Sequence, residues 1–419
     1  MDRGGRKPLT PIRTASVALI LVGLLTWAYG GRSAILWWTG RFSAVTYGQI
    51  PPIGWSDFLS ALGLAALGIA SAAAGYVVTS QASRWVTPRA ELESWVPKPS
   101  VTVAIPAGMA AASLLMLHWH VGITGVGATD VPTQLQGLLT YTRLLFFPLI
   151  LCVLAAKSSD RWRLGVLALV AADCLVASAT SGSRMVALFH ALPILFLTYP
   201  RMARIGVFFS LLLVGINVAT VGRTAWLPGI STDPNVIAEP GPAVEARSIA
   251  DLATFPVNYI VDRTLGLPEM LVTVQHGTLC DNWLEGARQA FYAVVPFISG
   301  EGQCVGLRSV YGLPETFAGG LSLDLLGGYW ALAGGYPLVF AVVSLLVGVA
   351  VGLSRVVGVW LELGLSLPFL SYVVFFLTLI LLLDGRLAMA LLFTCVSGLG
   401  CIVWWRSPKT HTSRAFTSE

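Results

Sequence analysis

The sequence predicts an all-α polytopic integral membrane protein with about ten transmembrane helices and one large extracytoplasmic loop. Apolar residues make up 55% of the 419-residue chain and charged residues only 11%, whereas a soluble protein of this length carries about a quarter charged residues. Apolar runs of about 20 residues, the length that spans the hydrocarbon core, recur along the chain. The net charge of +5 is spread over short loops, so we expect no nucleic-acid partner.

We expect ten spans, at residues 15–36, 57–80, 100–120, 136–156, 162–181, 184–199, 203–221, 321–353, 365–383 and 386–406. The eighth is too long for one span, and we expect a short re-entrant piece followed by a full helix. Pro193 is expected to kink the short sixth span. The first span lacks a small-residue cleavage site, which argues against a cleaved signal peptide.

Lysine and arginine placement predicts that both termini lie in the cytoplasm and that the protein resides in the cytoplasmic membrane. The short segments placed outside hold only four such residues, Arg32, Arg41, Arg184 and Arg386. The predicted organisation is seven helices in residues 1–221, an extracytoplasmic loop in 222–318, three helices in 319–406 and a cytoplasmic tail in 407–419.

The predicted loop, residues 222–318, is acidic and proline-rich, unlike the rest of the chain. A loop of this length is usually functional or disordered, and its apolar stretches predict an ordered cap with short helices. Cys280 and Cys304 are its only cysteines. Because an extracytoplasmic compartment is oxidising, we expect them to form a disulfide.

Arg143 and Asp173 are ionisable residues inside the fourth and fifth predicted spans. Each lies roughly 11 Å below the outer surface at 1.5 Å per residue. One interpretation is an ion pair between the two neighbouring antiparallel helices. The other places one or both in a hydrated cavity that opens to the outside.

The sequence TSGSR at 180–184 joins the fifth and sixth spans. Ser181, Gly182 and Ser183 offer a hydroxyl cap to the next helix, and Arg184 stands at its amino terminus. A helix amino terminus beside a guanidinium group favours an anion, although an arginine that reaches lipid headgroups has the same sequence pattern. Further arginines are expected at or near the outer face, namely Arg143, Arg223, Arg263, Arg288, Arg308 and Arg386. The positive-inside rule disfavours arginine there, and a phosphate or pyrophosphate substrate would explain it.

Residues 310–340 contain three glycine pairs, together with Glu315 and Asp324. Paired glycines permit close helix packing or a helix break. This stretch therefore predicts either a packing seam or the floor of a polar pocket beneath the loop.

These features resemble the Wzy-type O-antigen and oligosaccharide repeat-unit polymerases over about residues 136–406. The resemblance is carried by TSGSR at 180–184, the large loop after the seventh span, VDR at 261–263, VYGLPETF followed by GGYWALAGGYP, and DGR at 384–386. It implies a GT-C-like helical bundle that makes O-antigen, capsule or exopolysaccharide. It also implies a transferase that moves a growing glycan from polyprenyl pyrophosphate to a hydroxyl of a second lipid-linked repeat unit, without a metal, a nucleotide sugar or any other cofactor.

In such an enzyme, arginines would neutralise the charge that develops on the pyrophosphate. We expect this role first for Arg184, Arg223 and Arg263, and second for Arg143, Arg308 and Arg386. A general base near the acceptor hydroxyl is expected among His276, Asp281 and Glu315, although each also fits an ordinary solvated loop residue. The implied partners are lipid-linked oligosaccharides as donor and acceptor, membrane lipid, a chain-length regulator and a flippase.

Two other functions are compatible with the sequence. An O-antigen ligase shares the architecture and the donor but uses a lipid A core acceptor. A secondary transporter or flippase would use Arg143, Asp173 and the paired glycines as a substrate site at a broken helix. The gathering of arginines at one face favours the transferase.

Overall fold

The computed structural model describes residues 23, 26–39, 55–82, 99–121, 133–157, 163–197, 200–226, 266–295, 304, 325–365, 367, 369–383 and 386–406. These residues form helices, short helical turns and connections, and contain no strand. The described part of the chain is therefore all-helical, as predicted.

Five helices in the described part of the chain are long and apolar enough to cross a membrane, at Trp55–Gln81, Leu138–Lys157, Arg163–Ser181, Arg201–Gly222 and Pro337–Glu362. Four shorter apolar helices occur at Ala107–His118, Val186–Phe196, Leu370–Leu383 and Leu387–Gly400. Large apolar side chains such as Leu59 and Val78 are exposed, which suits a helix that faces lipid. The structure therefore has the character of a helical membrane protein.

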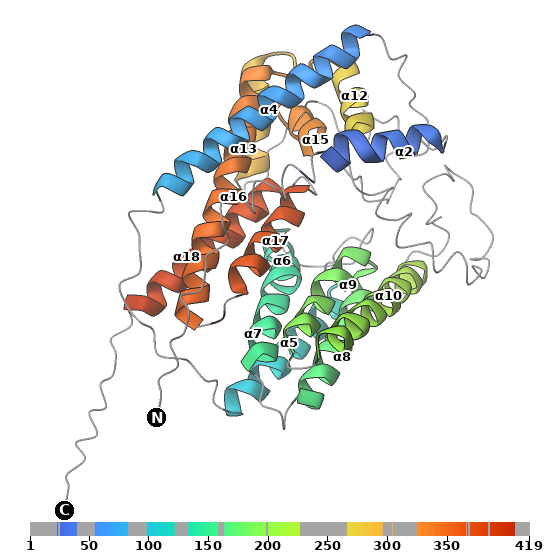
Figure 1. Cartoon of the computed structure of the whole chain (residues 1–419), viewed down its shortest axis with the longest axis vertical. Helices are drawn as coiled ribbons and strands as arrows, with labels where there is room; N and C mark the ends of the chain where they lie inside the picture. The colour runs from blue at the N-terminus through green and yellow to red at the C-terminus, as the bar shows by residue number, and fades with distance from the viewer. Residues whose placement is uncertain are drawn as a thin grey trace, which may run out of the picture.

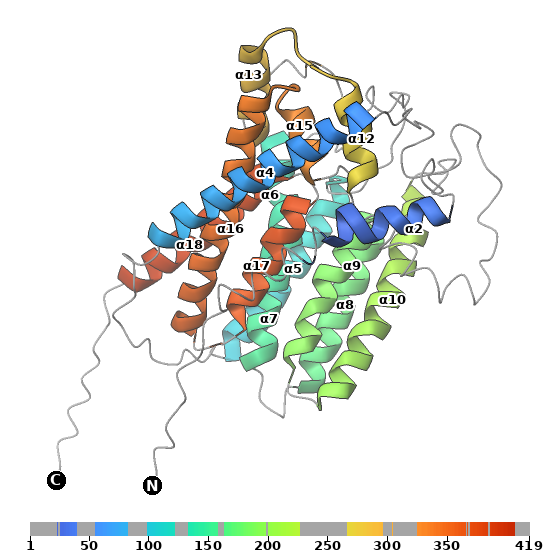
Figure 2. The same ribbon diagram turned by 45° about the horizontal axis from the view of Figure 1, so that its top comes forward.

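The helices form two groups (Figure 1). One group is built around α4 (Trp55–Ala82) and α16 (Pro337–Leu365), with α17 (Leu370–Leu383) and α18 (Leu387–Arg406) packed on α16. The other contains α5 (Pro99–His118), α7 (Phe147–Lys157), α8 (Arg163–Ser181), α9 (Arg184–Ala191) and α10 (Arg201–Trp226). Figure 2 shows α8, α9 and α10 side by side.

The pairing of α4 with α16 depends on glycines at which the two backbones meet. A Cβ atom at Gly75 would lie 2.1 Å from the carbonyl oxygen of Leu345, and one at Gly348 would lie 1.8 Å from that of Ala72. Both distances are far below any tolerable contact. Small residues at such positions let helices associate closely in a membrane.

Three short helices pack at one end of the α4–α16 pair (Figure 2). They are α12 (Leu267–Gln275), α13 (Trp283–Val294) and α15 (Leu325–Leu332). Gly334 and Gly335 follow α15 with φ of +66° and +80°, a conformation that glycine adopts readily. They separate α15 from α16, so the overlong eighth segment is divided as predicted, but α16 extends to Leu365, beyond the predicted end at 353.

The sixth predicted span also changes where expected. After α9 the chain tightens into a 3-10 turn, η4 (Leu192–Phe196), which contains Pro193. Proline cannot donate the α-helical hydrogen bond, which accounts for the change.

The other predicted segments are described in part. Within 15–36, residue 23 is helical, and the described stretch continues with a π-helical turn, η1 (Trp27–Gly31), and the start of α2 (Arg32–Trp38). Within 222–318, α12 and α13 lie in the described residues, together with the end of α10. The described helices do not establish ten spans or the full extent of the loop.

Candidate functional site

The connection between α8 and α9 is a tight hairpin at the sequence TSGSR. Gly182 has φ of +61° and its N–H donates to the carbonyl of Ser178 at 3.1 Å. The expected hydroxyl cap is not formed: Ser183 occupies the N-cap position of α9 without a side-chain bond. Instead, the Ser181 hydroxyl accepts from the Ser183 N–H at 3.1 Å, so the serine stabilises the turn and not the helix terminus.

α10 brings its carboxyl-terminal end to the same hairpin. A Cβ atom at Gly222 would lie 2.2 Å from the carbonyl oxygen of Ala179, near the end of α8. Arg223 follows Gly222 directly, and Arg184 is the first residue of α9. At the level of the backbone, two of the three leading arginines are therefore brought to one end of the α8–α9–α10 bundle, which we call the hairpin end.

Arg143 reaches the hairpin end from a third direction. α6 (Thr133–Tyr141) passes into a π-helical turn, η3 (Thr142–Phe146), and Arg143 lies in this turn with only 4% of its surface exposed. Its Nη2 donates to the Thr180 hydroxyl and, at 3.4 Å, to the carbonyl of Val176, while its Nε is buried and has no hydrogen-bond partner among the described residues. π-Helical turns often mark functional sites.

The predicted ion pair between Arg143 and Asp173 is not formed. The Asp173 carboxylate contacts Nδ1 of His190, which is fully buried on α9. Asp173 attracts the Arg143 guanidinium electrostatically, but the guanidinium donates its hydrogen bonds to the Val176 carbonyl and the Thr180 hydroxyl. The prediction failed because α9 packs on the same part of α8 and supplies a nearer partner.

Arg386 and Arg288, which the sequence placed at or near the outer face, lie with the first helix group. Arg386 is exposed at the turn before α18, where its N–H donates to the carbonyl of Leu381 at 2.8 Å. The neighbouring carbonyl of Leu382 accepts from the Tyr329 hydroxyl of α15 at 3.1 Å. Arg288, on α13, places its guanidinium over the Tyr292 ring at 5.4 Å.

The described general-base candidates are not part of the hairpin end. His276 and Asp281 are exposed on the segment between α12 and α13. This segment packs on the turn after α15, where the Leu279 N–H donates to the carbonyl of Gly334 at 2.9 Å. In Figures 1 and 2 it lies away from the α8–α9 connection.

Three predicted site residues, Arg263, Arg308 and Glu315, lie outside the described residues. The structure therefore neither supports nor contradicts their roles.

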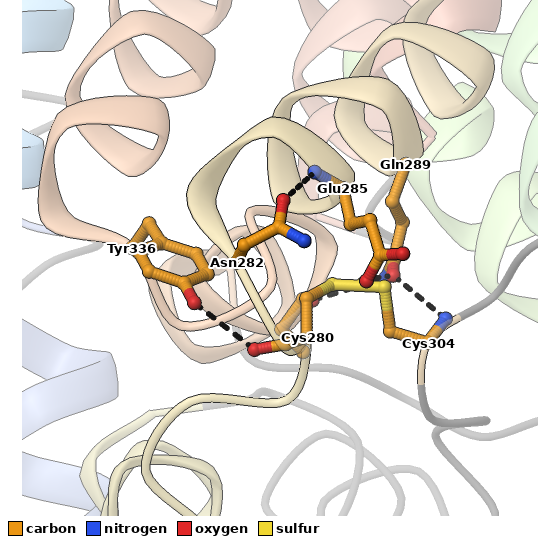
Figure 3. Close-up of a disulfide and its surroundings, with 7 residues drawn as sticks. Cys280, Asn282, Glu285, Gln289, Cys304 and Tyr336 are labelled. Atoms are coloured by element: carbon orange, nitrogen blue, oxygen red, sulfur yellow. Dashed lines mark hydrogen bonds between the residues drawn. A yellow bond between two sulfur atoms is a disulfide. The ribbon is translucent and has the colours of Figure 1, made fainter.

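Cys280 and Cys304 form the predicted disulfide, with their Cα atoms 5.0 Å apart (Figure 3). Gln289 of α13 lies beside it: its Oε1 accepts from the Cys304 N–H at 3.1 Å, and its Nε2 donates to the carbonyl of Ala331 at 3.2 Å. The Tyr336 hydroxyl donates to the carbonyl of Cys280 at 3.0 Å. The disulfide thus joins residue 304 to the region in which α13, α15 and the start of α16 meet.

α13 begins directly after this disulfide. Asn282 caps the helix by accepting from the Glu285 N–H at 3.0 Å. This cap accounts for the predicted short helix in the sequence beginning at Asn282, and Figure 3 shows Asn282 close to Cys280.

Sequence reasoning missed two buried basic side chains, a histidine and an arginine. His190 lies six residues after Arg184 in an apolar helix, and the rule that intramembrane ionisable groups are functional candidates could have found it. Arg32 is fully buried in α2. It lies near the predicted end of the first span, where an arginine is ordinarily expected to be exposed, and no sequence signal indicated its burial.

The hairpin end thus combines a buried guanidinium that is only partly hydrogen-bonded, a carboxylate held by a histidine, and the starting or ending backbone of two further helices that carry arginine. Such an arrangement suits recognition of an anion. No protein-family model matches the sequence, and no curated protein or solved structure matches it.

Proposed function

We propose that this protein is a membrane glycosyltransferase that polymerises lipid-linked oligosaccharide repeat units on the outer face of the cytoplasmic membrane. In this reaction the bond between the donor sugar and polyprenyl pyrophosphate breaks, and a bond forms between that sugar carbon and an acceptor hydroxyl oxygen. The acceptor loses its hydroxyl proton, and polyprenyl pyrophosphate leaves. The principal requirement is stabilisation of negative charge on the leaving group.

The observation that carries this proposal is Arg143, buried at the hairpin end with no partner for its Nε in the part of the chain that the structure describes. A buried charged group without a full set of bonds is costly, and that cost is justified where the group binds a ligand. A pyrophosphate would supply the missing acceptors, because guanidinium groups bind phosphate oxygens strongly.

The neighbouring backbone supports an anion at the same place. α9 begins at Arg184, so its free N–H groups and the positive end of its dipole are located at the hairpin end. Arg223 follows Gly222, at which α10 approaches the Ala179 carbonyl oxygen of α8. We assign Arg184, Arg223 and Arg143 to the pyrophosphate, with Arg263, Arg308 and Arg386 as further contributors.

The proposed location rests on the disulfide and on the charge pattern. A Cys280–Cys304 bond is typical of an extracytoplasmic compartment, and the positive-inside rule places residues 222–318 on the same side. We propose ten spans with both termini cytoplasmic. A single cysteine introduced at the exposed Asp281, in a variant that retains Cys280 and Cys304, should react with a membrane-impermeant maleimide from outside intact cells.

The acceptor hydroxyl would lose its proton to Glu315, His276 or Asp281. His276 and Asp281 are exposed and lie away from the hairpin end in Figures 1 and 2, so either one would act only on an acceptor that extends to the α12–α13 connection. Each candidate is replaced singly by alanine and by a neutral polar residue, as Glu315→Gln, His276→Gln and Asp281→Asn. The base is the residue whose replacement lowers the transfer rate without lowering donor binding.

The direct test replaces Arg143, Arg184 and Arg223 singly by alanine and by lysine in membrane-inserted protein. We expect polymer amount and length to fall with alanine and to recover only partly with lysine, because lysine lacks the bidentate geometry. Arg288→Ala is the matched control, since Arg288 lies on α13 against Tyr292. Full polymer formation in every arginine variant would overturn the proposal.

A strain in which the gene is deleted distinguishes a polymerase from an O-antigen ligase. Loss of a polymerase leaves single repeat units attached to their final acceptor, whereas loss of a ligase leaves polymer on the polyprenyl carrier. A deletion strain that shows the second pattern would reassign the chain as a ligase.

The break between α15 and α16 favours a transporter as a second candidate, because broken helices form substrate sites in many transporters. Here, however, Gly334 and Gly335 of this break pack against the α12–α13 connection in the first helix group, whereas Arg143 and Asp173 lie in or beside the second. Substrate flux in proteoliposomes, without polymer formation from purified lipid-linked repeats, would establish the transporter.

A further inference from the structure

One feature of the hairpin end is the position of Asp173 relative to Arg143. Asp173, Val176 and Thr180 are spaced three, four and seven residues apart along α8, so they occupy one face of the helix. Arg143 is bonded to the two residues nearer the hairpin. Asp173 lies about one turn deeper on the same face.

His190 accounts for the separation of these two charges. Its Nδ1 contacts the Asp173 carboxylate, and its Nε2 is buried without a partner in the described residues. Because a carboxylate only accepts, Nδ1 carries the proton. Among the described residues, Asp173 is the only hydrogen-bond partner of this imidazole.

We propose that His190 is a positioning residue that holds the Asp173 carboxylate away from Arg143, so that the guanidinium remains available to an anionic ligand. The inference rests on the proposed function insofar as the ligand is a polyprenyl pyrophosphate. The restraint of Asp173 is itself a property of the folded protein and can be measured without a ligand.

Removal of the histidine would change the electrostatics of the site. A carboxylate that loses its partner in a low-dielectric interior must find another, and Arg143 is the cation that already attracts it. A direct Asp173–Arg143 ion pair would occupy guanidinium N–H groups and neutralise the charge that attracts a phosphate. Anion affinity would then fall although Arg143 is still present.

The His190 Nδ1 and the Asp173 carboxylate are engaged with each other. We therefore assign the pair a positioning role, and place the general base among Glu315, His276 and Asp281.

The first experiment measures the affinity of farnesyl diphosphate, a short polyprenyl pyrophosphate, for the full chain in lipid nanodiscs. We expect His190→Leu to weaken binding about tenfold or more, because a charge at the site is neutralised. His190→Asn, which can keep an N–H donor near the Nδ1 position, should remain within a few-fold of the unsubstituted protein. Asp173→Asn added to His190→Leu should restore binding, since the competing charge is gone.

Rescue by Asp173→Asn distinguishes positioning from a purely structural role, in which the double variant would bind as weakly as His190→Leu. Weak binding by the double variant, or unchanged binding by His190→Leu, would overturn the inference. Equal binding by the unsubstituted protein and Arg143→Gln would instead argue against the proposed function.

A second measurement tests whether His190 restrains Asp173 even if Arg143 does not bind farnesyl diphosphate. The unfolding temperature is measured for Arg143→Gln, for Asp173→Asn and for the double variant. The same set is measured in protein that retains His190 and in protein that carries His190→Leu. We expect the non-additivity between Arg143 and Asp173 to be larger when His190 is absent, because the two charges then form a direct pair. Equal non-additivity in both backgrounds would overturn the inference.

Discussion

The α4–α16 pair and the hairpin end are both helix contacts in a membrane protein, but they are built in opposite ways. At α4–α16, glycines let backbone meet backbone, as Gly75 and Gly348 show. At the hairpin end, buried ionisable side chains lie between the helices, and no described residue bonds to the buried Nε of Arg143 or Nε2 of His190. Close packing of small residues stabilises helices in lipid, whereas incompletely satisfied polar groups cost stability. The first contact therefore suits assembly, and the second suits the ligand recognition that we propose.

The sharpest test of the first contact is Gly75→Leu. The Cβ alone would lie 2.1 Å from the Leu345 carbonyl oxygen, so α4 must move away from α16, at a cost of about 3 kcal/mol or more. We expect a large fall in the unfolding temperature of purified protein. Gly63→Leu is the matched control in the same helix, because a Cβ there meets nothing within 4 Å; equal destabilisation by both would contradict the comparison.

Loss of the disulfide is expected to be nearly as large. Cys280→Ser opens the crosslink across a sequence separation of 24 residues, which removes about 3 kcal/mol in the chain-entropy model. Thermal unfolding should show the loss, and a reducing agent should lower the stability of the unsubstituted protein but not that of the variant. Cys395→Ser, at an exposed free cysteine, should unfold like the unsubstituted protein.

Thr180→Val tests the hairpin end by removing the hydroxyl that accepts from Arg143. The buried guanidinium then loses a charged hydrogen bond, for which we expect about 2 kcal/mol of destabilisation. Thr394→Val in α18 is the comparison, since the Thr394 hydroxyl donates only to carbonyls of its own helix, Ala390 and Leu391. An equal fall in unfolding temperature for both variants would remove the distinction between the regions.

Tyr336→Phe should have the smallest effect. It removes the hydroxyl that donates to the carbonyl of Cys280 at 3.0 Å, for about 1 kcal/mol in unfolding. The change leaves the disulfide intact, so reagents for free thiols should label this variant no more than the unsubstituted protein. Tyr372→Phe, on the half-exposed surface of α17, provides the control for loss of a tyrosine hydroxyl.

The sequence alone determined the class of the protein and the location of most of its apolar helices. Hydropathy is a local sum over about 20 residues, so it locates a helix without knowledge of its neighbours. The same locality explains the successes at Pro193 and at the break before α16, because proline and paired glycines act on their own backbone. The pairing of Cys280 with Cys304 followed from there being only two cysteines in the loop.

Only the tertiary structure decided which side chains meet. The spacing of residues along α8 allows Asp173 to face either α9 or η3. Because α9 packs on α8, the Asp173 carboxylate contacts His190. The separation of His276 and Asp281 from the hairpin end, and the glycine contacts between α4 and α16, likewise depend on helices far apart in the chain. Partner choice depends on the rotation and crossing of whole helices, which one-dimensional periodicity leaves undefined.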